Sequence, residues 1–245
     1  MIETRARAQA VIIGGGVTVD GVVQTKPGHK TLLSSDVALV HEPLPYVSRG
    51  ALKLKHALEV FPVEVAGKVA ADIGASTGGF TEVLLEAGAT RVYAIDVGYG
   101  QLAWKLRQDP RVLVLERTNI RHLESLPEPV DLAVIDTSFI SLRQVLPAVR
   151  TLMRPDGEAV TLIKPQFEAG RERVGKGGVV RDATVWRDVL RAVLGFAEET
   201  GWAVRGLAAS PIRGPAGNVE FLAYLRMTDA SIDIDEAIEV TLASL

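Results

Sequence analysis

Short apolar runs alternate with longer amphipathic stretches over most of the chain, which is typical of strands separated by helices. The predicted strands are Val69–Ile73, Arg91–Asp96, Val112–Glu116, Val130–Asp136, Ala159–Ile163, Trp202–Ala208 and Val219–Leu225. The predicted helices between them are Phe80–Ala87, Leu102–Gln108, Leu142–Leu152 and Ala183–Thr200. Such alternation requires an α/β fold with a parallel, doubly wound sheet and right-handed crossovers. Because no helix separates the last two strands, we expect an antiparallel hairpin at the sheet edge.

The first 40 residues follow a different pattern. A helical stretch over Arg5–Ile13 ends at the three glycines 14–16, which supply the positive φ that stops a helix. Two valine-rich runs then flank Asp20-Gly21, a strong hairpin signal, and a further strand is expected over Ser34–Leu39. We therefore predict a small, separate module with helix and strands at the N-terminus.

These patterns divide the chain into four segments. Two prolines and no periodicity mark the linker, and Ser48 is predicted to cap a helix over Arg49–Phe61. The predicted segments are a module over 1–40, a linker over 41–47, the α/β domain over 48–228 and an acidic, helix-capable tail over 229–245.

Composition narrows the functional classes. The chain has 245 residues and no cysteine, which excludes disulfides, thiolate nucleophiles and cysteine-ligated zinc. No metal site is expected. No apolar run approaches the roughly 20 residues of a membrane span, so a soluble, cytoplasmic protein is expected. Although the net charge is −3, Lys164–Arg181 carries five basic and two acidic residues. Such a patch suits either a solvated surface or contact with a nucleic acid backbone.

The turn after the first predicted strand of the α/β domain is rich in glycine, and it reads Gly-Ala-Ser-Thr-Gly-Gly over 74–79. A strand, tight turn and helix of this kind bring backbone N–H groups to one edge of the sheet. A dinucleotide fingerprint would have its second glycine where Ser76 stands. The turn therefore disfavours a pyrophosphate, and with it a nicotinamide-dependent oxidoreductase, but it tolerates a nucleoside without phosphates.

Two carboxylates flank this turn. Asp72 can face an ammonium group, and Asp96, 24 residues later, is near the spacing of about 20 residues at which an acid reaches ribose hydroxyls. Either one alone could simply cap a turn, but together they favour S-adenosylmethionine. Asn119 could face adenine or serve only as a turn residue. The predicted cofactor-binding residues are Asp72, Gly74, Ser76, Thr77, Gly78, Gly79, Phe80, Asp96, Asn119 and Asp136.

Ionisable side chains are predicted to gather at the same edge of the sheet, from Asp136, Lys164 and Glu220. Burial and a neighbouring lysine favour a neutral amine at Lys164, which could then act as a general base. Lys53 and Lys55 are two residues apart and leave their predicted helix on different faces, so only one can reach the site. On spacing alone, a pair of ordinary salt bridges is an equally good interpretation.

Five motifs in order resemble the TlyA/haemolysin A family of FtsJ-type ribose methyltransferases. They are SRGALKL, ADIGASTGGFTEVLL, DTSFISL, LIKPQFE and GNVEFL, and the similarity covers residues 3–225. The resemblance implies a Rossmann-like methyltransferase sheet and a catalytic tetrad of Lys53, Asp136, Lys164 and Glu220. It selects Lys53 over Lys55, and it implies in-line methyl transfer from S-adenosylmethionine to a ribose 2′-OH, with cytidine in ribosomal RNA as the target. The partner would be ribosomal RNA or a ribosomal subunit.

The N-terminal module resembles the later part of the S-four-like RNA-binding fold, so we expect a partial copy of it. The matching residues are Arg7, Ala8, Ile12, Gly15, Val17, Val19, Asp20 and Gly21. The resemblances imply RNA contacts, together with a glycine-rich segment over Gln166–Arg181 that is expected to move until substrate binds. The predicted RNA-binding residues are Arg5, Arg7, Lys26, Arg49, Arg171, Arg173 and Lys176.

Two other functional classes compete with the methyltransferase. A membrane-damaging haemolysin is disfavoured, because the sequence shows neither a basic amphipathic helix nor a membrane span. A non-catalytic RNA-binding or ribosome-assembly factor would retain the pocket without the reaction. The sequence leaves open the oligomeric state and the nucleotide that is modified.

Overall fold

The computed structural model describes residues 8–9, 11–12, 15–40 and 45–245 of the chain. The chain divides into two compact units, Met1–Arg49 and Gly50–Leu245, and each is considered by itself. Arg5, Arg7, most of the helix predicted around them and residues 41–44 of the predicted linker lie outside the described residues.

The first unit contains a three-stranded antiparallel sheet, with β1 (Val17–Val19) between β2 (Val22–Gln24) and β3 (Val37–Leu39). Asp20 and Gly21 join β1 to β2 with φ of 51° and 79°, the left-handed geometry that a two-residue hairpin loop requires. The predicted hairpin is therefore present. The backbone N–H of Asp36 donates to Oδ1 of Asp20 over 2.8 Å, which ties the turn to the segment leading into β3.

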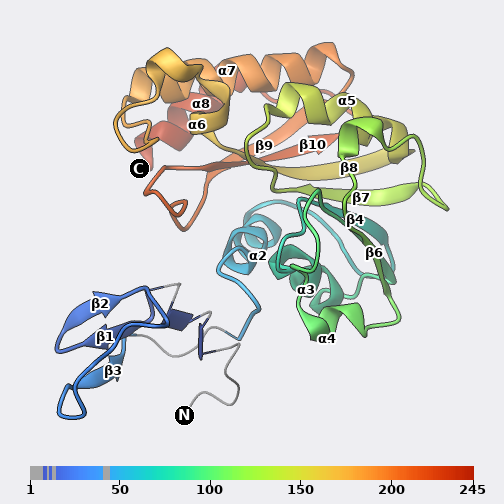
Figure 1. The fold of residues 1–245 in the computed structure, drawn as a ribbon. Coiled ribbons are helices and arrows are strands. Elements are labelled where there is room, and N and C mark those ends of the chain that lie inside the picture. Colours follow the sequence, from blue (N-terminus) through green and yellow to red (C-terminus); the bar gives the residue numbers. More distant parts are fainter. Residues whose placement is uncertain (1–7, 10, 13–14, 41–44) are drawn as a thin grey trace. The chain divides into compact units, whose positions relative to one another are not determined.

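The second unit is built on a seven-stranded sheet in the order β6-β5-β4-β7-β8-β10-β9 (Figure 1). Its strands are β4 (Val69–Ile73), β5 (Arg91–Ile95), β6 (Val112–Leu115), β7 (Val130–Ile135), β8 (Met153–Ile163), β9 (Ala203–Ala209) and β10 (Phe221–Arg226). Strands β4 to β8 are parallel, whereas β10 runs antiparallel to both β8 and β9. The prediction of a doubly wound sheet that ends in an antiparallel hairpin is confirmed.

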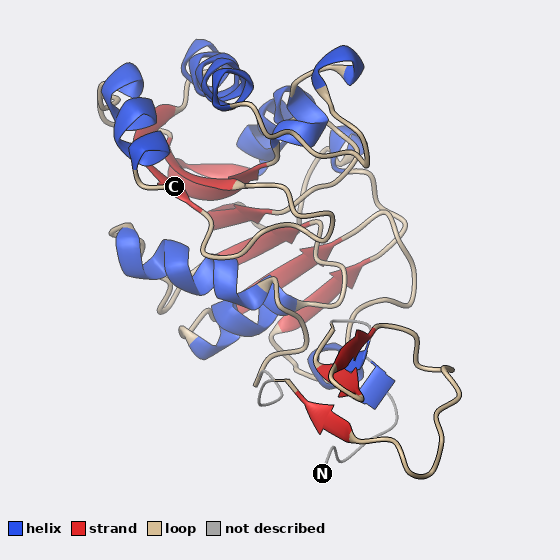
Figure 2. Cartoon of the chain, turned by 90° about the vertical axis from the view of Figure 1, so that its left-hand side faces the viewer, coloured by secondary structure: helices blue, strands red, loops and turns tan. Residues whose placement is uncertain are grey.

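Helices cover both faces of this sheet (Figures 1 and 2). The α-helices are α2 (Ala51–Val60), α3 (Gly79–Glu86), α4 (Trp104–Arg107), α5 (Leu142–Leu152), α6 (Pro165–Glu168), α7 (Ala183–Glu199) and α8 (Ile234–Ala243). Two 3-10 turns, η1 (Ile120–His122) and η2 (Arg171–Arg173), complete the unit as described. Helices α2 to α4 lie on one face, and α5, α7 and α8 lie on the other (Figure 1). Apolar residues three and four apart bury one side of α7, which is why this sequence forms a helix packed on a sheet.

Two local predictions were wrong. Ser48 does not cap a helix: it lies in a bend, and α2 begins at Ala51 after Gly50, with no side-chain hydrogen bond at that end. Strand β8 begins at Met153, six residues before the predicted Ala159. Its early residues, which include an exposed proline and a buried glycine, have the composition of a turn but are extended here.

The C-terminal tail contains helix α8, which packs against α7 and the edge strand β9. The backbone N–H of Ile232 donates to the carbonyl of Val204 over 2.9 Å, and Thr241 Oγ1 donates to the carbonyl of Leu207 over 3.3 Å. Ion pairs from Arg187 to Glu239 and from Arg191 to Asp235 join α7 to α8. The tail is therefore part of the packed unit.

Candidate active site

The carboxyl ends of the parallel strands meet at one edge of the sheet. Ile73, the last residue of β4, pairs with Ile95 of β5 on one side and with Ile135 of β7 on the other. The next residues along the chain, Gly74, Asp96 and Asp136, are therefore neighbours in space. Open α/β sheets bind their ligands at this edge.

A cavity of about 570 Å³ opens there, a size typical of sites for small ligands. Its wall combines apolar side chains, such as Ile95 and Ile120, with a few polar groups. Of the predicted cofactor-binding residues, those on the wall are Gly74, Ser76, Asp96, Asn119 and Asp136. The others lie outside the wall, and they are Asp72, Thr77, Gly78, Gly79 and Phe80.

The glycine-rich turn passes close to the backbone of the next strand end. Gly74 has φ of 87°, and a Cβ atom there would lie 2.4 Å from the carbonyl oxygen of Asp136, so only glycine fits. Ser76 is also left-handed, with φ of 48°. Its backbone N–H donates to Oδ2 of Asp96 over 2.7 Å, while the N–H of Gly98 donates to Oδ1 over 2.7 Å. Asp96 is thereby held in one orientation at the cavity wall, with lone pairs left for a ligand.

Asp72 lies behind the turn and is completely buried. Thr81 Oγ1 donates to its Oδ2 over 2.6 Å, whereas Oδ1 is buried without a hydrogen-bond partner among the described residues. Burial raises the pKa of the Asp72 carboxyl to about 7. Asp72 therefore supports the turn from the interior of the domain. A cation near its carboxyl would stabilise the ionised form.

The four residues of the predicted tetrad converge beside the cavity. Nζ of Lys53 lies 2.6 Å from Oε2 of Glu220 and 3.8 Å from Oδ2 of Asp136. Nζ of Lys164 forms an ion pair with Oδ1 of Asp136. Lys53, Lys164 and Glu220 are 6%, 8% and 1% exposed, and only Asp136 reaches the cavity wall. The two lysines and two carboxylates balance in charge, as buried ionised groups require.

The fold explains how residues so far apart in sequence meet. Phe221 of β10 pairs with Ile163 of β8, so Glu220 and Lys164 flank the same pair at the sheet edge. Lys53 lies on the buried side of α2 with Leu54, whereas Lys55 is exposed. The prediction that only one of these two lysines can reach the site is confirmed.

Two residues at the site were missed by the sequence analysis. Lys164 Nζ donates to Oγ of Ser138 over 2.9 Å. Phe139 is 90% exposed at the cavity wall, and its ring centroid lies 5.0 Å from that of Phe167. Its φ of 64° is rare for a residue with a side chain. Both residues stand within the DTSFISL run, but their residue types alone do not distinguish them from ordinary turn residues.

The predicted RNA-binding residues that the structure describes are on the surface: Lys26 and Arg49 in the first unit, and Arg171, Arg173 and Lys176 in the second. The glycine-rich segment around the last three is tied down by the buried side chain of Asn218. Its Oδ1 accepts from the N–H of Val180, and its Nδ2 donates to the carbonyl of Gly178, each over 2.9 Å. The expected movement of this segment stays a prediction.

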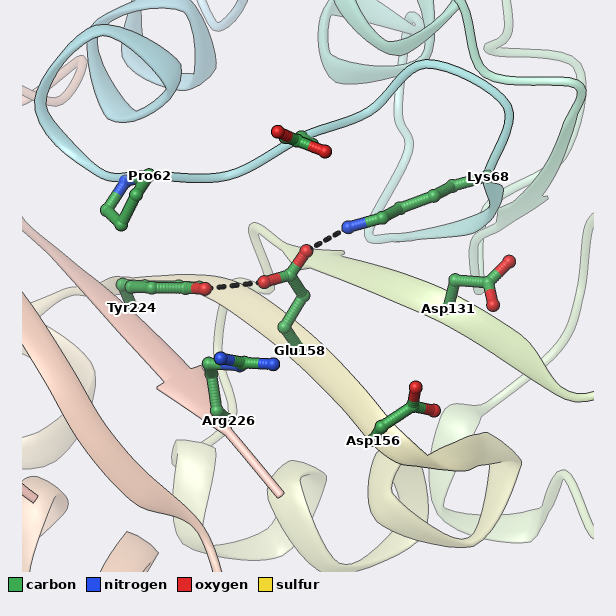
Figure 3. A pocket seen from close by; sticks show the side chains of 8 residues that line it. Pro62, Lys68, Asp131, Asp156, Glu158, Tyr224 and Arg226 are labelled. Atoms are coloured by element: carbon green, nitrogen blue, oxygen red, sulfur yellow. Dashed lines mark hydrogen bonds and ion pairs between the residues drawn. The ribbon is translucent and has the colours of Figure 1, made fainter. Parts of the chain in front are cut away.

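A second cavity, of about 260 Å³, opens at the opposite edge of the sheet (Figure 3). Lys68 and Tyr224 both point to the buried carboxylate of Glu158 and contact its two oxygens. Asp131 accepts from the N–H of Val69 over 2.9 Å and pairs with Arg154 over 2.9 Å. These carboxylates hold together the starts of β4 and β7 and the interior of β8.

The strand order, the reversed strand β10 and a nucleoside-sized cavity at the carboxyl edge define the class of Rossmann-like methyltransferases. The model of the FtsJ-like methyltransferase family matches residues 46–227. The chain belongs to this family, it is a methyltransferase, and its cofactor is S-adenosylmethionine.

The chain is 50% identical over 238 residues to the 16S/23S rRNA (cytidine-2′-O)-methyltransferase TlyA of Mycobacterium tuberculosis, covering 95% of this chain and 88% of TlyA. It is 40% identical to Hemolysin A of Brachyspira hyodysenteriae, with 91% and 93% covered. A solved structure titled "Putative hemolysin from Streptococcus thermophilus" superposes with a TM-score of 0.83 at 45% identity, covering 99% of this chain and 90% of that one. Within the described residues, no helix is long and apolar enough to cross a membrane.

Proposed function

We propose that this enzyme transfers the methyl group of S-adenosylmethionine to the ribose 2′-OH of cytidine nucleotides in ribosomal RNA, in the cytoplasm. The observation that carries the proposal is the buried cluster of Lys53, Asp136, Lys164 and Glu220 beside the cofactor cavity. The curated relative TlyA, half of whose aligned residues are identical, carries this activity in its name.

The residues around the cavity suit the cofactor. Asp96 is oriented to accept hydrogen bonds from a ribose diol, and Ile95, Val97 and Ile120 supply apolar surface for a base. Ser76 stands where a pyrophosphate site has a glycine, and Gly74 lies close to the backbone of Asp136. The turn therefore lacks the open glycine backbone that binds a pyrophosphate. S-adenosylmethionine has a ribose and a base but no phosphate, and it supplies an electrophilic methyl group to the site.

A ribose hydroxyl is a weak nucleophile, so the reaction needs a base as the new bond forms. When bound, S-adenosylmethionine would supply the methyl group and leave as the thioether, and Nζ of Lys164 would accept the proton of the hydroxyl. Lys164 suits this role better than Lys53 does. The nearer carboxylate contact of Lys53 is Glu220, which lies outside the cavity wall, whereas Lys164 contacts one carboxylate and the hydroxyl of Ser138, both of which belong to residues on the cavity wall.

Lys53, Asp136 and Glu220 then act as a frame. Asp136 lies between the two amines and faces the cavity, while Glu220 fixes Lys53 from the buried side. Because the sulfonium charge is lost during transfer, positioning supplies much of the rate effect. The target nucleotide has to leave any helical stack to reach this buried edge.

We further propose that RNA is held by surfaces outside the catalytic cluster. In the first unit, which we assign as a partial S-four-like module over residues 1–40 followed by a linker over 41–47, Lys26 is exposed. In the methyltransferase domain, which we assign to 48–228, the exposed cations follow the strand end of Lys164. The basic surfaces attract the phosphate backbone regardless of sequence.

The decisive experiment measures transfer of labelled methyl from S-adenosylmethionine to ribosomal RNA and to isolated ribosomal subunits. Wild type should transfer, and Lys164→Ala should lose at least the 10²- to 10⁴-fold that a general base contributes while still binding the cofactor. Lys105→Ala is the matched control, because Lys105 pairs with Glu82 away from the cluster. A wild type that binds cofactor but modifies neither substrate would support the non-catalytic assembly factor. Loss of cofactor binding in Lys164→Ala would refute its role as base.

A further inference from the structure

In the proposed function, Lys164 is the general base. Ser138 is the uncharged side chain that contacts its amine. Its Oγ accepts a hydrogen bond from Nζ of Lys164 over 2.9 Å. Ser138 lies on the wall of the cofactor cavity, while the Lys164 side chain is 9% exposed. The serine hydroxyl therefore stands between the buried amine and the space where methyl transfer would occur.

The two partners of Lys164 respond differently to its charge. The charge–charge attraction of Asp136 is lost when Lys164 is neutral, although its carboxylate can still accept a hydrogen bond from an N–H of the amine. A hydroxyl oxygen accepts a hydrogen bond from an ammonium or from a neutral amine alike. A lysine that acts as a base has to be neutral before it takes the proton, and in that state the hydrogen bond to Ser138 still orients it, beside any that it donates to Asp136.

A neutral amine has two N–H bonds and one lone pair in a tetrahedral arrangement. If Ser138 Oγ accepts one N–H, rotation about the last side-chain bond is restricted and the lone pair has a defined direction. On the basis of the proposed function, we propose that Ser138 is a positioning residue, which turns the lone pair of neutral Lys164 towards the 2′-hydroxyl of the RNA. Lys53 has no equivalent, because its ion-pair partners among the described residues are the carboxylates of Glu220 and Asp136.

The loop that carries Ser138 is built against the segment that carries Lys164. Three contacts follow the same order along both segments. They join Lys164 to Ser138, Phe167 to Phe139 and Glu168 to Ser141. Three successive contacts fix the position of the loop along the lysine segment. The hydroxyl of Ser138 is therefore placed by the whole loop rather than by its own rotamer alone.

The last of these contacts anchors the end of the loop, where helix α5 begins, to helix α6. Ser141 Oγ and the N–H of Leu142 donate to the two carboxylate oxygens of Glu168 over 2.6 and 2.7 Å. Burial raises the pKa of Glu168. At the middle of the loop, Phe139 has φ of 64°, and such unusual geometry is concentrated at functional sites.

Three variants test the proposal. Ser138→Ala removes the acceptor, Ser138→Thr keeps it, and Ser141→Ala removes a hydroxyl from the same loop while Leu142 still holds Glu168. Each is assayed for methyl transfer at saturating cofactor, for cofactor affinity and for RNA KM. We expect Ser138→Ala to lower kcat about ten-fold, the effect of losing one hydrogen bond to the base, with cofactor affinity and KM unchanged. Ser138→Thr should restore most of kcat, and Ser141→Ala should change it less than two-fold.

Crystal structures of Ser138→Ala and Ser141→Ala, determined at a pH alkaline enough to deprotonate Lys164, supply a readout that does not depend on activity. Nζ of Lys164 should be displaced or disordered in the first and unchanged in the second. A wild type without methyl transfer would refute the proposed function, whereas these structures would still decide the role of Ser138. Equal losses of kcat in both variants, or Nζ of Lys164 unmoved in Ser138→Ala, would overturn the proposal.

Discussion

Nζ of Lys53 and Oε2 of Glu220 lie 2.6 Å apart, and both side chains are almost fully buried. One comes from helix α2 and the other precedes strand β10, 167 residues later. This ion pair joins the two ends of the catalytic domain beneath the cofactor cavity. It is therefore a structural contact as well as part of the proposed active site.

Breaking this pair from one side should destabilise the fold. Glu220→Ala leaves the ammonium of Lys53 buried beside a single, more distant carboxylate, and we expect a loss of about 3 to 5 kcal/mol in the free energy of unfolding. The double variant Lys53→Met/Glu220→Leu removes both charges and should lose much less. Urea denaturation of the three proteins measures the difference. A double variant as unstable as Glu220→Ala would contradict the prediction.

Gly74 and Gly67 form a matched pair for testing the cofactor turn. Both have positive φ, but a Cβ at Gly74 would collide with the backbone of Asp136, whereas nothing lies within 4 Å of a Cβ at Gly67. Alanine at either position should cost about 1 to 2 kcal/mol in backbone strain. Only Gly74→Ala should abolish cofactor binding, measured by calorimetry. Loss of binding in Gly67→Ala would show that stability, not the collision, controls the site.

Burial of Asp72 should make stability depend on pH. The carboxyl has its pKa raised from 3.8 to about 7 in the folded protein, so it keeps a proton that the unfolded chain releases. Its contribution is therefore fully present below pH 3.8 and is lost as pH rises to about 7. Asp72→Asn does not titrate. Its free energy of unfolding, compared with that of wild type, should therefore rise by up to about 4 kcal/mol over this pH range. Denaturation at a series of pH values measures this gain, and a constant difference would contradict it.

The exposed ring of Phe139 should stack on a base of the RNA. Its position at the cavity wall and its contact with Phe167 make a platform whose outer face is open. Stacking on an aromatic ring is worth about 1 to 3 kcal/mol, so Phe139→Ala should raise the KM for RNA at least several-fold. Stability should stay close to wild type, because the ring is 90% exposed. Phe139→Trp should restore the KM, and failure to do so would argue against stacking.

The exposed cations of the glycine-rich segment should contact phosphates. Arg171→Ala/Lys176→Ala should lower the slope of log affinity for RNA against log salt by about 1.4 to 1.8, corresponding to two contacts. Arg187→Ala is the control, because Arg187 is paired with Glu239 on the helical face. An unchanged slope in the double variant would exclude these residues from the RNA interface.

The sequence predicted elements best where the apolar pattern was dense. Strand Val69–Ile73 and helix Leu142–Leu152 were predicted residue for residue, the first because a short buried run precedes a glycine-rich turn and the second because its apolar residues recur with a helical period. The start of β8 was missed, since only Met153 pairs with β7 there and the exposed residues that follow lie in an irregularity of the register, which has no apolar pattern. The cap predicted at Ser48 was wrong because Ser48 lies in a bend and a turn, not a helix, follows it.

The site was predictable in part. The convergence of Asp136, Lys164 and Glu220 follows from strand ends at one edge, and the choice of Lys53 came from the family motif. Sequence could not show that Asp72 is sealed behind the turn, because a strand residue can face either side of the sheet. Ser138 likewise gains its role only from the fold of its loop.

Strand β9 forms one edge of the seven-stranded sheet. Helix α8 and the segment before it pack against this edge. An uncovered edge strand offers unpaired N–H and C=O groups to any other chain and is a common route to aggregation. Here the N–H of Ile232 donates a hydrogen bond to the carbonyl of Val204 in β9, and helix α8 packs against the same strand. The acidic tail therefore covers part of an edge that β9 would otherwise leave open for pairing with another chain.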